Sequence, residues 1–365
     1  MPAYHGGSFF KAIGEDFKTI ENKDTIISAD VLDAWFDPSP KIIEKLSENL
    51  SFFIKTSPPT HCEGLIETIS KNRGIPIENI AVGGGSSDLM FCYFPNLITP
   101  KSSIMILDPM YGEYKHIFNH VIDVNLSLFS LKREEDFVVN TAQLLAEILV
   151  QKPAILVMVN PNSPTGKYIP KNEMIDLINQ IPKSTTIIID ETYIEYLNKA
   201  FSLEYLVVNN PNVIVIKSMS KVYALSGVRV AYIMAHKNII QKLNQFIPPW
   251  SVSLPAQVAA IEALNDEAYY LPKYQQTHVL RNKMIADLNG ISNIKIYNSV
   301  SNFFMIELLS EINADLICEA LAIQNIFIRN CDSMSIQFEN KFIRIAVKTE
   351  IENEKIISAL KKFLL

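Results

Sequence analysis

The stretch that decides the fold runs from Val213 to Met234 and reads VIVIKSMSKVYALSGVRVAYIM. Two apolar runs, Val213–Ile216 and Val230–Met234, flank a polar segment that contains Lys221. Continuous apolar runs of this length are typical of strands covered on both faces. Lys221 therefore lies between two buried strands, where we expect desolvation to favour the neutral, nucleophilic amine. Taken alone, the same residue also fits a surface lysine on a turn.

Three further apolar runs precede this stretch, and each ends at a polar residue. They are Ser103–Leu107, Ala154–Val159 and Thr186–Ile189, which are followed by Asp108-Pro109, Asn160-Pro161 and Asp190-Glu191. The segment Lys171–Ile181 between the last two has apolar residues at helical spacing. Strands separated by helices predict a parallel sheet of the α/β class. Ligands of such sheets bind beyond the carboxyl ends of the strands.

The last third of the chain has a mixed pattern. We expect strands at Ile294–Tyr297, Asn302–Glu307, Ile326–Arg329 and Phe342–Val347, a helix at Ala314–Ile323, and a capping box, Thr349-Glu350-Ile351-Glu352, that starts a final helix. The 365 residues are enough for roughly two domains. We predict a large α/β domain over residues 38–248 and a smaller α+β domain built from residues 1–37 and 249–365.

Composition argues against several classes of protein. The 33 basic and 39 acidic residues give a net charge of −6, which disfavours a nucleic-acid binder. No run of about 18 apolar residues is present, so we expect no membrane span. The four cysteines lie far apart without a C-x-x-C pair, which disfavours a zinc ribbon or a disulfide framework. We therefore expect a cytoplasmic protein with no metal, membrane or nucleic-acid partner.

Two segments suit a phosphate group. Ser218, Ser220 and Arg229 offer hydroxyls and a fixed cation around Lys221. The glycine-rich segment 83–88, GGGSSD, precedes an apolar stretch and is compatible with a phosphate bound at a helix N-terminus. It is not a Walker A loop, because no G-K-[ST] follows.

Two further segments follow buried strands. If Asp190 is buried, its carboxylate needs a cationic partner, and a protonated pyridine nitrogen would be one. The alternative role for Asp190 is that of an ordinary helix N-cap. Tyr193, three residues on, places a phenol within reach of a ring hydroxyl. The segment 160–166, NPNSPTG, forms a rigid turn whose amides present hydrogen-bond donors, although it is also compatible with a turn of no further role.

Together these segments resemble the pyridoxal-5′-phosphate (PLP) enzymes of fold type I, aminotransferase class I/II. The resemblance rests on S-x-S-K-x(7)-R from Ser218 to Arg229, on D-E-x-Y from Asp190 to Tyr193, and on NPNSPTG. It covers residues 40–365, and the branch that it resembles most comprises histidinol-phosphate aminotransferases and threonine-phosphate decarboxylases. It implies a mainly parallel seven-stranded sheet in the large domain and a homodimer.

The resemblance also implies roles for particular residues. Lys221 would bind PLP covalently and later shuttle a proton, Asp190 would pair with the pyridinium nitrogen, and Tyr193 would hydrogen-bond the ring 3′-oxygen. The implied phosphate cup consists of Ser86, Ser87, Ser218, Ser220 and Arg229.

Four more residues belong to the implied site. Tyr111 matches the aromatic residue that stacks on the PLP ring. Either Asn162 or Ser163 would contact the 3′-oxygen, because a serine stands where the family usually has asparagine. Arg344 matches the arginine that binds the substrate α-carboxylate, and Arg329 matches a second arginine near the distal phosphate of the substrate.

Two features differ from the family pattern. An N-x-N-P-type segment near the start is replaced by LDAWFDP at residues 32–38, and a tyrosine-proline pair is replaced by Ser57-Pro58. His5-Gly6-Gly7, together with the segments Ile328–Cys331 and Ile343–Val347, is more similar to the decarboxylase members. Because most enzymes of the fold that the chain resembles catalyse transamination, we predict an aminotransferase that moves an amino group between an amino acid, phosphorylated or not, and a 2-oxo acid. A PLP-dependent decarboxylase of a phosphorylated amino acid and a non-enzymatic PLP-binding protein are the alternatives.

Overall fold

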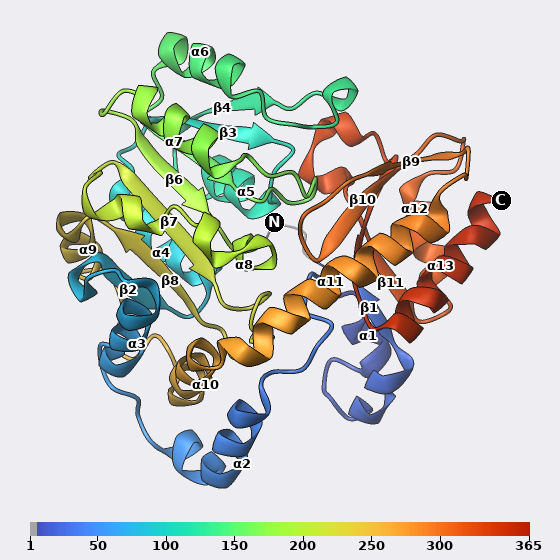
Figure 1. Ribbon diagram of the computed structural model, residues 1–365, viewed down its shortest axis with the longest axis horizontal. Coiled ribbons are helices and arrows are strands. Elements are labelled where there is room, and N and C mark those ends of the chain that lie inside the picture. Colours follow the sequence, from blue (N-terminus) through green and yellow to red (C-terminus); the bar gives the residue numbers. More distant parts are fainter. Residues whose placement is uncertain (1–5) are drawn as a thin grey trace.

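Two β-sheets form the framework of the computed structural model, which describes residues 6–365 (Figure 1). The larger sheet has the order β2-β8-β7-β6-β5-β3-β4. Its strands are β2 (Ile80–Gly83), β3 (Ser103–Asp108), β4 (Asn125–Ser130), β5 (Ile155–Val159), β6 (Thr186–Asp190), β7 (Val213–Ser218) and β8 (Ala231–Ala235). Only β8 runs antiparallel to its neighbours, β2 and β7. The predicted mainly parallel seven-stranded sheet is therefore confirmed.

Five strands of this sheet were predicted to within two residues at each end, and β2 and β4 were not. The five predicted strands carry continuous apolar runs because both of their faces are buried. By contrast, β4 lies at the edge of the sheet and exposes several of its residues. Its sequence, NLSLFS, therefore lacks a continuous apolar run. The strand β2 has only four residues, which is too short to stand out.

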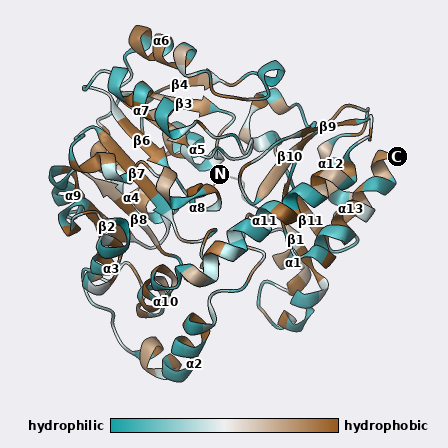
Figure 2. Ribbon diagram, in the orientation of Figure 1, coloured by the Kyte–Doolittle hydropathy of each residue, from teal (hydrophilic) through white to brown (hydrophobic). Residues whose placement is uncertain are grey.

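Helices cover the larger sheet and separate its strands along the chain. The helices of the described residues are α1 (Phe10–Ile13), α2 (Pro40–Lys55), α3 (Glu63–Arg73), α4 (Ser86–Leu97), α5 (Gly112–His120), α6 (Thr141–Gln151), α7 (Lys171–Gln180), α8 (Ile194–Leu197), α9 (Lys237–Leu243), α10 (Leu254–Asn265), α11 (Glu267–Leu288), α12 (Ala314–Ala322) and α13 (Glu350–Leu364). Figure 2 shows the strands of the larger sheet mainly in hydrophobic colours and hydrophilic residues on the surrounding helices. The apolar core thus lies between the sheet and its helices.

The second sheet has five strands in the order β1-β11-β12-β10-β9. Its members are β1 (Ile27–Ala29), β9 (Ile294–Tyr297), β10 (Phe303–Leu308), β11 (Ile326–Asn330) and β12 (Phe342–Ala346). The four C-terminal strands were predicted, whereas the parallel pairing of β1 with β11 was not. The predicted capping box is also confirmed, because Thr349 and Glu352 exchange hydrogen bonds at the start of α13.

The direction of the strands sets the position of the candidate site. Because β5, β6 and β7 are parallel, their carboxyl ends meet at one edge of the larger sheet. Val159 pairs with Asp190, and Asp190 pairs with Ile216, so Asn160, Asp190 and Lys217 lie near one another. In Figure 1 the second sheet lies beside this edge, and α11 runs from one sheet toward the other.

Among residues 6–365, no helix is long and apolar enough to cross a membrane. The same residues contain no group of three or more histidine, cysteine, aspartate or glutamate side chains arranged to hold a metal ion. All four cysteines are free.

Candidate active site

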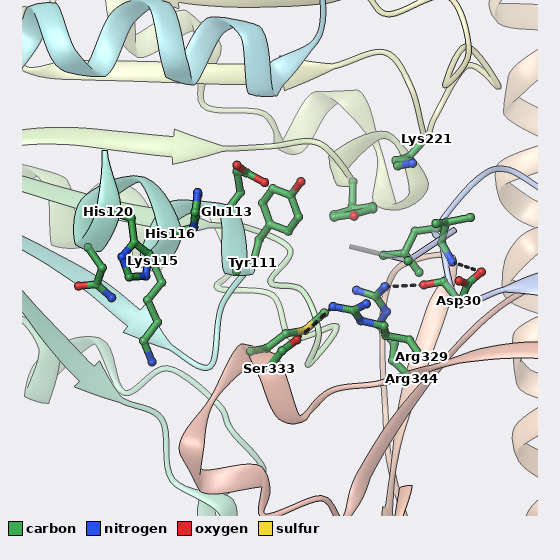
Figure 3. Close-up of a pocket in the computed structure, with 17 residues that line it drawn as sticks. Asp30, Tyr111, Glu113, Lys115, His116, His120, Lys221, Arg329, Ser333 and Arg344 are labelled. Atoms are coloured by element: carbon green, nitrogen blue, oxygen red, sulfur yellow. Dashed lines mark hydrogen bonds between the residues drawn. The ribbon is translucent and has the colours of Figure 1, made fainter. Parts of the chain in front are cut away.

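A cavity of about 660 Å³ lies between the two sheets (Figure 3). Its wall includes five residues that the sequence singled out, Tyr111, Tyr193, Lys221, Arg329 and Arg344. They come from widely separated parts of the chain, and the fold brings them to one place. The volume suits a small organic ligand.

Lys221 follows β7 on the cavity wall, but its surroundings differ from the expectation. Its Nζ lies 2.7 Å from Oδ1 of Asp33 and 3.4 Å from Oγ of Ser226. The side chain of Lys221 is 24% exposed. The amine is therefore paired with a carboxylate, whereas the apolar runs had predicted desolvation between two strands. The sequence did not indicate this pairing because Asp33 lies 188 residues away along the chain.

Asp190 ends β6 and is buried. Its carboxylate accepts hydrogen bonds from the hydroxyl of Tyr114 at 2.8 Å and from the backbone N–H and hydroxyl of Thr192 at 3.0 and 2.6 Å. Among the described residues, Asp190 forms no salt bridge. Burial raises the pKa of Asp190, although these hydrogen bonds oppose the shift. The fold therefore holds an ionisable carboxylate that lacks an ion-pair partner among residues 6–365.

The N-terminus of α4 lies beside Arg229. The helix begins at Ser86, and Gly85 precedes it with a φ of 107°. A Cβ on Gly85 would lie 2.5 Å from Nη2 of Arg229, so only glycine permits this approach. Arg229 itself has a φ of 59° and donates a hydrogen bond to Oγ of Ser220 at 3.3 Å. Backbone amides and a guanidinium thus meet where an anion would be favoured.

The other residues predicted to bind the cofactor lie around the N-terminus of α4. Ser218 ends β7 and, like Ser220, is buried. Burial raises the pKa of Tyr111 to about 12, with Glu113 adding to the shift and a hydrogen bond from Ser87 opposing it. The hydrogen bond brings α4 and the residue before α5 into contact. The predicted phosphate-binding residues therefore cluster around the start of α4.

Asn162 and Ser163 occupy different environments. The Nδ2 of Asn162 donates to the carbonyl of Pro109 and to Oγ1 of Thr165, both at 3.0 Å, while its Oδ1 is buried without a hydrogen bond. The hydroxyl of Ser163 accepts a hydrogen bond from Nη1 of Arg344 at 2.9 Å. Burial raises the pKa of Tyr193, and Arg344 and a hydrogen bond from Ser163 oppose that shift. Ser163 thus connects Tyr193 with Arg344.

Arg329 and Arg344 face each other on neighbouring antiparallel strands. They are direct partners in the β11–β12 register, and both are buried. The Nη2 of Arg344 donates to the backbone carbonyl of Asp30 at 3.1 Å, and the guanidinium lies 5.6 Å from the centroid of the Phe303 ring. Arg344 forms no salt bridge with any residue between 6 and 365. Like charges directly opposite each other are destabilising, so this pair favours an anion in the cavity.

A buried ionic network lies next to the site. Nζ of Lys217 lies 2.8 Å from Glu195, 3.5 Å from Glu191 and 3.6 Å from Glu204. Arg73 forms a second ion pair with Glu195 at 2.7 Å. Burial alone would lower the pKa of Lys217, but the three carboxylates raise it well above its ordinary value. This network joins the end of β7 and the end of α3 to the segment that follows β6.

Sequence reasoning missed three contributors to the site. Tyr114 contacts Asp190 from the first turn of α5, and its neighbours along the chain, Glu113 and Lys115, gave no indication of that contact. Asp33 was noticed only as part of a segment that differs from the family pattern. Lys217 lay within the polar stretch before Lys221, where a buried lysine with three acidic partners cannot be distinguished from a surface one.

Comparison with known proteins identifies relatives over nearly the whole chain. The family model described as aminotransferase class I and II matches residues 30–360. A histidinol-phosphate aminotransferase from Methanococcus maripaludis is 28% identical over 329 residues, which cover 89% of this chain and 86% of that protein.

Solved structures agree with this similarity. The histidinol-phosphate aminotransferase from Clostridium acetobutylicum superposes with a TM-score of 0.83 at 25% identity, covering 92% of this chain and 98% of that one. The enzyme of the same name from Sinorhizobium meliloti, in complex with pyridoxal-5′-phosphate, has a TM-score of 0.81 at 21% identity, with 92% and 90% covered. The L-threonine-O-3-phosphate decarboxylase from Porphyromonas gingivalis also has a TM-score of 0.81, at 20% identity, with 93% and 99% covered. The last two similarities concern the fold alone.

Proposed function

Because the chain belongs to the aminotransferase class I and II family and is an aminotransferase, we propose that it uses PLP to move an amino group between an amino acid and a 2-oxo acid. The observation that carries the cofactor assignment is Asp190, a buried carboxylate without an ion-pair partner among the described residues. A protonated pyridine nitrogen is the kind of cation that this carboxylate lacks.

Other residues around the cavity also fit PLP. The start of α4, with Ser86 and Ser87, would hold the phosphate together with Ser218, Ser220 and Arg229. Tyr111 would cover one face of the ring, and Tyr193 would hydrogen-bond the 3′-oxygen. For the contact with the 3′-oxygen we favour Asn162, because its buried Oδ1 has no hydrogen-bond partner, whereas Ser163 already hydrogen-bonds both Arg344 and Tyr193. When bound, PLP supplies an electron sink for the electrons released at the substrate α-carbon.

The residues of this chain would bind the substrate and move its proton. Arg344 would bind the substrate α-carboxylate through two parallel hydrogen bonds, which would fix the orientation of the α-carbon. Nζ of Lys221 would accept the proton from the substrate α-carbon and would later return a proton to the substrate. Arg329, opposite Arg344, would bind a second anionic group of the substrate, such as a phosphate. The substrate class is therefore an amino acid that carries an anionic side chain.

We also propose that the two sheets belong to two domains, residues 38–248 and residues 1–37 with 249–365. This division places Lys221 in the large domain and Arg344 in the small one, on either side of the cavity. A cytoplasmic location and a role in amino-acid metabolism complete the proposal. The four free cysteines support that location, because reducing compartments keep thiols unpaired.

A PLP-dependent decarboxylase of a phosphorylated amino acid is the second candidate. One observation favours it: Gly6 lines the cavity, and the backbone N–H of Gly7 donates to Oδ2 of Asp30 at 2.6 Å, beside Arg344. The sequence similarity to decarboxylases lies in His5-Gly6-Gly7, Ile328–Cys331 and Ile343–Val347, and of these residues His5 is outside the described part of the chain. The position of the carboxylate relative to Lys221 decides which bond at the α-carbon breaks, so Arg344 is central to both candidates.

A half-reaction screen tests the function. PLP-loaded protein is mixed with amino acids and their phosphorylated forms, and 2-oxo acid and carbon dioxide are assayed separately. We expect 2-oxo acid with at least one donor, and we expect Lys221→Ala to lose at least about 10²–10⁴-fold in rate. Lys242→Ala on α9 is the control and should retain activity. Carbon dioxide without 2-oxo acid would favour the decarboxylase, and near-normal rates in Lys221→Ala would contradict the assignment.

Asp190→Asn separates a cofactor role from a structural one. Burial raises the pKa of Asp190, so the ionised carboxylate destabilises the cofactor-free fold once the pH rises above its unfolded pKa. We therefore expect the cofactor-free variant to unfold at the wild-type temperature or higher at pH 7, while the half-reaction is severely slowed. Thermal melting and single-turnover kinetics measure the two effects. A lower melting temperature with normal kinetics would instead indicate a purely structural role for the Asp190 carboxylate.

Arg344→Lys tests carboxylate binding. Lysine keeps the charge but lacks the planar fork that binds both oxygens, so we expect a higher KM for the amino donor and a lower kcat. The affinity for PLP should be unchanged, because its proposed phosphate contacts lie on other elements. Steady-state kinetics and a PLP titration measure these quantities. A normal KM combined with a lower melting temperature would identify Arg344 as a purely structural residue.

We further propose a homodimer, supported by exposed apolar side chains on α2. Ile43, Leu50, Phe52 and Ile54 are between 50% and 72% exposed. Sedimentation equilibrium should give twice the chain mass of 41.2 kDa, and Phe52→Asp with Ile54→Asp should shift the protein toward the monomer. A fully active wild-type monomer at micromolar concentration would contradict the proposal.

A further inference from the structure

We propose that Asp33 is a positioning residue for Lys221, whose amino group it holds at the cavity wall whenever that amine is not bonded to another molecule. The catalytic role of Lys221 rests on the proposed function. The contact between the two side chains is present in the structure whether or not that function is correct. Asp33 lies in the segment 32–38, which differs from the family pattern, and the resemblance assigns it no role.

The contact joins three groups. Oδ1 of Asp33 lies 2.7 Å from Nζ of Lys221 and 2.6 Å from Oγ of Ser226. The Ser226 hydroxyl also lies 3.4 Å from the same Nζ, so the three polar atoms form a closed triangle. The side chain of Lys221 is 24% exposed and that of Asp33 is 39% exposed. This partial burial reduces screening by solvent and strengthens the pair relative to one on the open surface.

The backbone around Asp33 is held in place from the second sheet. Nδ2 of Asn302 donates to the carbonyl of Leu32 at 2.9 Å, and Nζ of Lys348 donates to the carbonyl of Asp33 at 3.4 Å. Nε1 of Trp35 donates to Oγ1 of Thr277 on α11 at 2.8 Å. The backbone that carries the Asp33 carboxylate is therefore anchored to residues adjoining β10 and β12 and to α11, and not to the segment that carries Lys221.

The charges around the pair keep Asp33 ionised. Burial alone would raise the pKa of the Asp33 carboxyl, but Lys221, Ser226 and Lys348 hold it below its ordinary value. Lys348 in turn faces Glu352 and Asp30 as well as Asp33. At neutral pH, Lys221 thus has an anionic partner at hydrogen-bond distance. The hydrogen bond to this carboxylate keeps the amino group of Lys221 in one place.

Asp33→Asn removes the charge with little change in size, and Asp37→Asn is the matched control because Asp37 lies on the same segment with an exposed side chain. In the cofactor-free full-length protein, the rate of Lys221 acetylation by acetic anhydride is measured against pH by mass spectrometry. Removing an adjacent carboxylate favours the neutral amine, so we expect labelling about tenfold faster in Asp33→Asn on the rising limb of the profile. Asp37→Asn should follow the wild type, and Asp33→Glu should restore most of the wild-type profile.

Ser226→Ala provides a second test that leaves the carboxylate in place. We expect a smaller shift in the same direction, because the hydroxyl that orients Oδ1 is lost. A labelling profile of Asp33→Asn that coincides with those of the wild type and Asp37→Asn would overturn the proposal, whatever the melting temperature. A wild-type protein that fails the half-reaction screen but shows the Asp33 effect would overturn the proposed function alone.

Discussion

The candidate site depends on a buried carboxylate that forms no salt bridge with any described residue. Asp190 stands at the carboxyl end of β6, where the parallel neighbours β5 and β7 also end and where the backbone leaves the sheet. Thr192 and Tyr114 satisfy its oxygens by hydrogen bonding, yet burial still raises its pKa. Such an arrangement is costly in the empty protein and becomes favourable when a cationic ring nitrogen is bound. The placement of the other site residues follows from this one position.

Charge is distributed unevenly across the cavity. On the side of the larger sheet, the carboxylate of Asp190 lies near the start of α4, where Arg229 and the backbone amides favour an anion. On the side of the second sheet, Arg329 and Arg344 oppose each other in register, and Arg344 forms no salt bridge within residues 6–365. A ligand with a phosphate and a basic ring nitrogen, and a substrate with two acidic groups, would complement these charges. The contact from Arg344 to Ser163 joins the two sides directly.

Much of this arrangement was predictable from sequence, because buried parallel strands carry apolar runs that end abruptly at polar residues. Asp190, Lys217 and Ser218 follow such runs, and the resemblance to a known family added Arg344 inside an apolar strand. The edge strand β4 and the short strand β2 lack that signal, so they were missed. The role of Asp33 could not be predicted for a different reason. Its contact with Lys221 joins residues 188 positions apart, and no local sequence pattern encodes such a pair. The prediction of a desolvated Lys221 was wrong because the apolar pattern of a strand indicates only which residues neighbour Lys221 along the chain. It does not indicate a residue from a distant part of the sequence, such as Asp33, that contacts the amine in the fold.

The most direct test of the central claim is the ¹⁵N chemical shift of the ring nitrogen of labelled PLP bound to the wild-type protein. If Asp190 is the partner of that nitrogen, the shift will be that of a protonated pyridine and will persist above the pH at which free PLP loses the proton. A neutral pyridine shift at the same pH as in free PLP would contradict the account, because the buried carboxylate would then serve some other purpose.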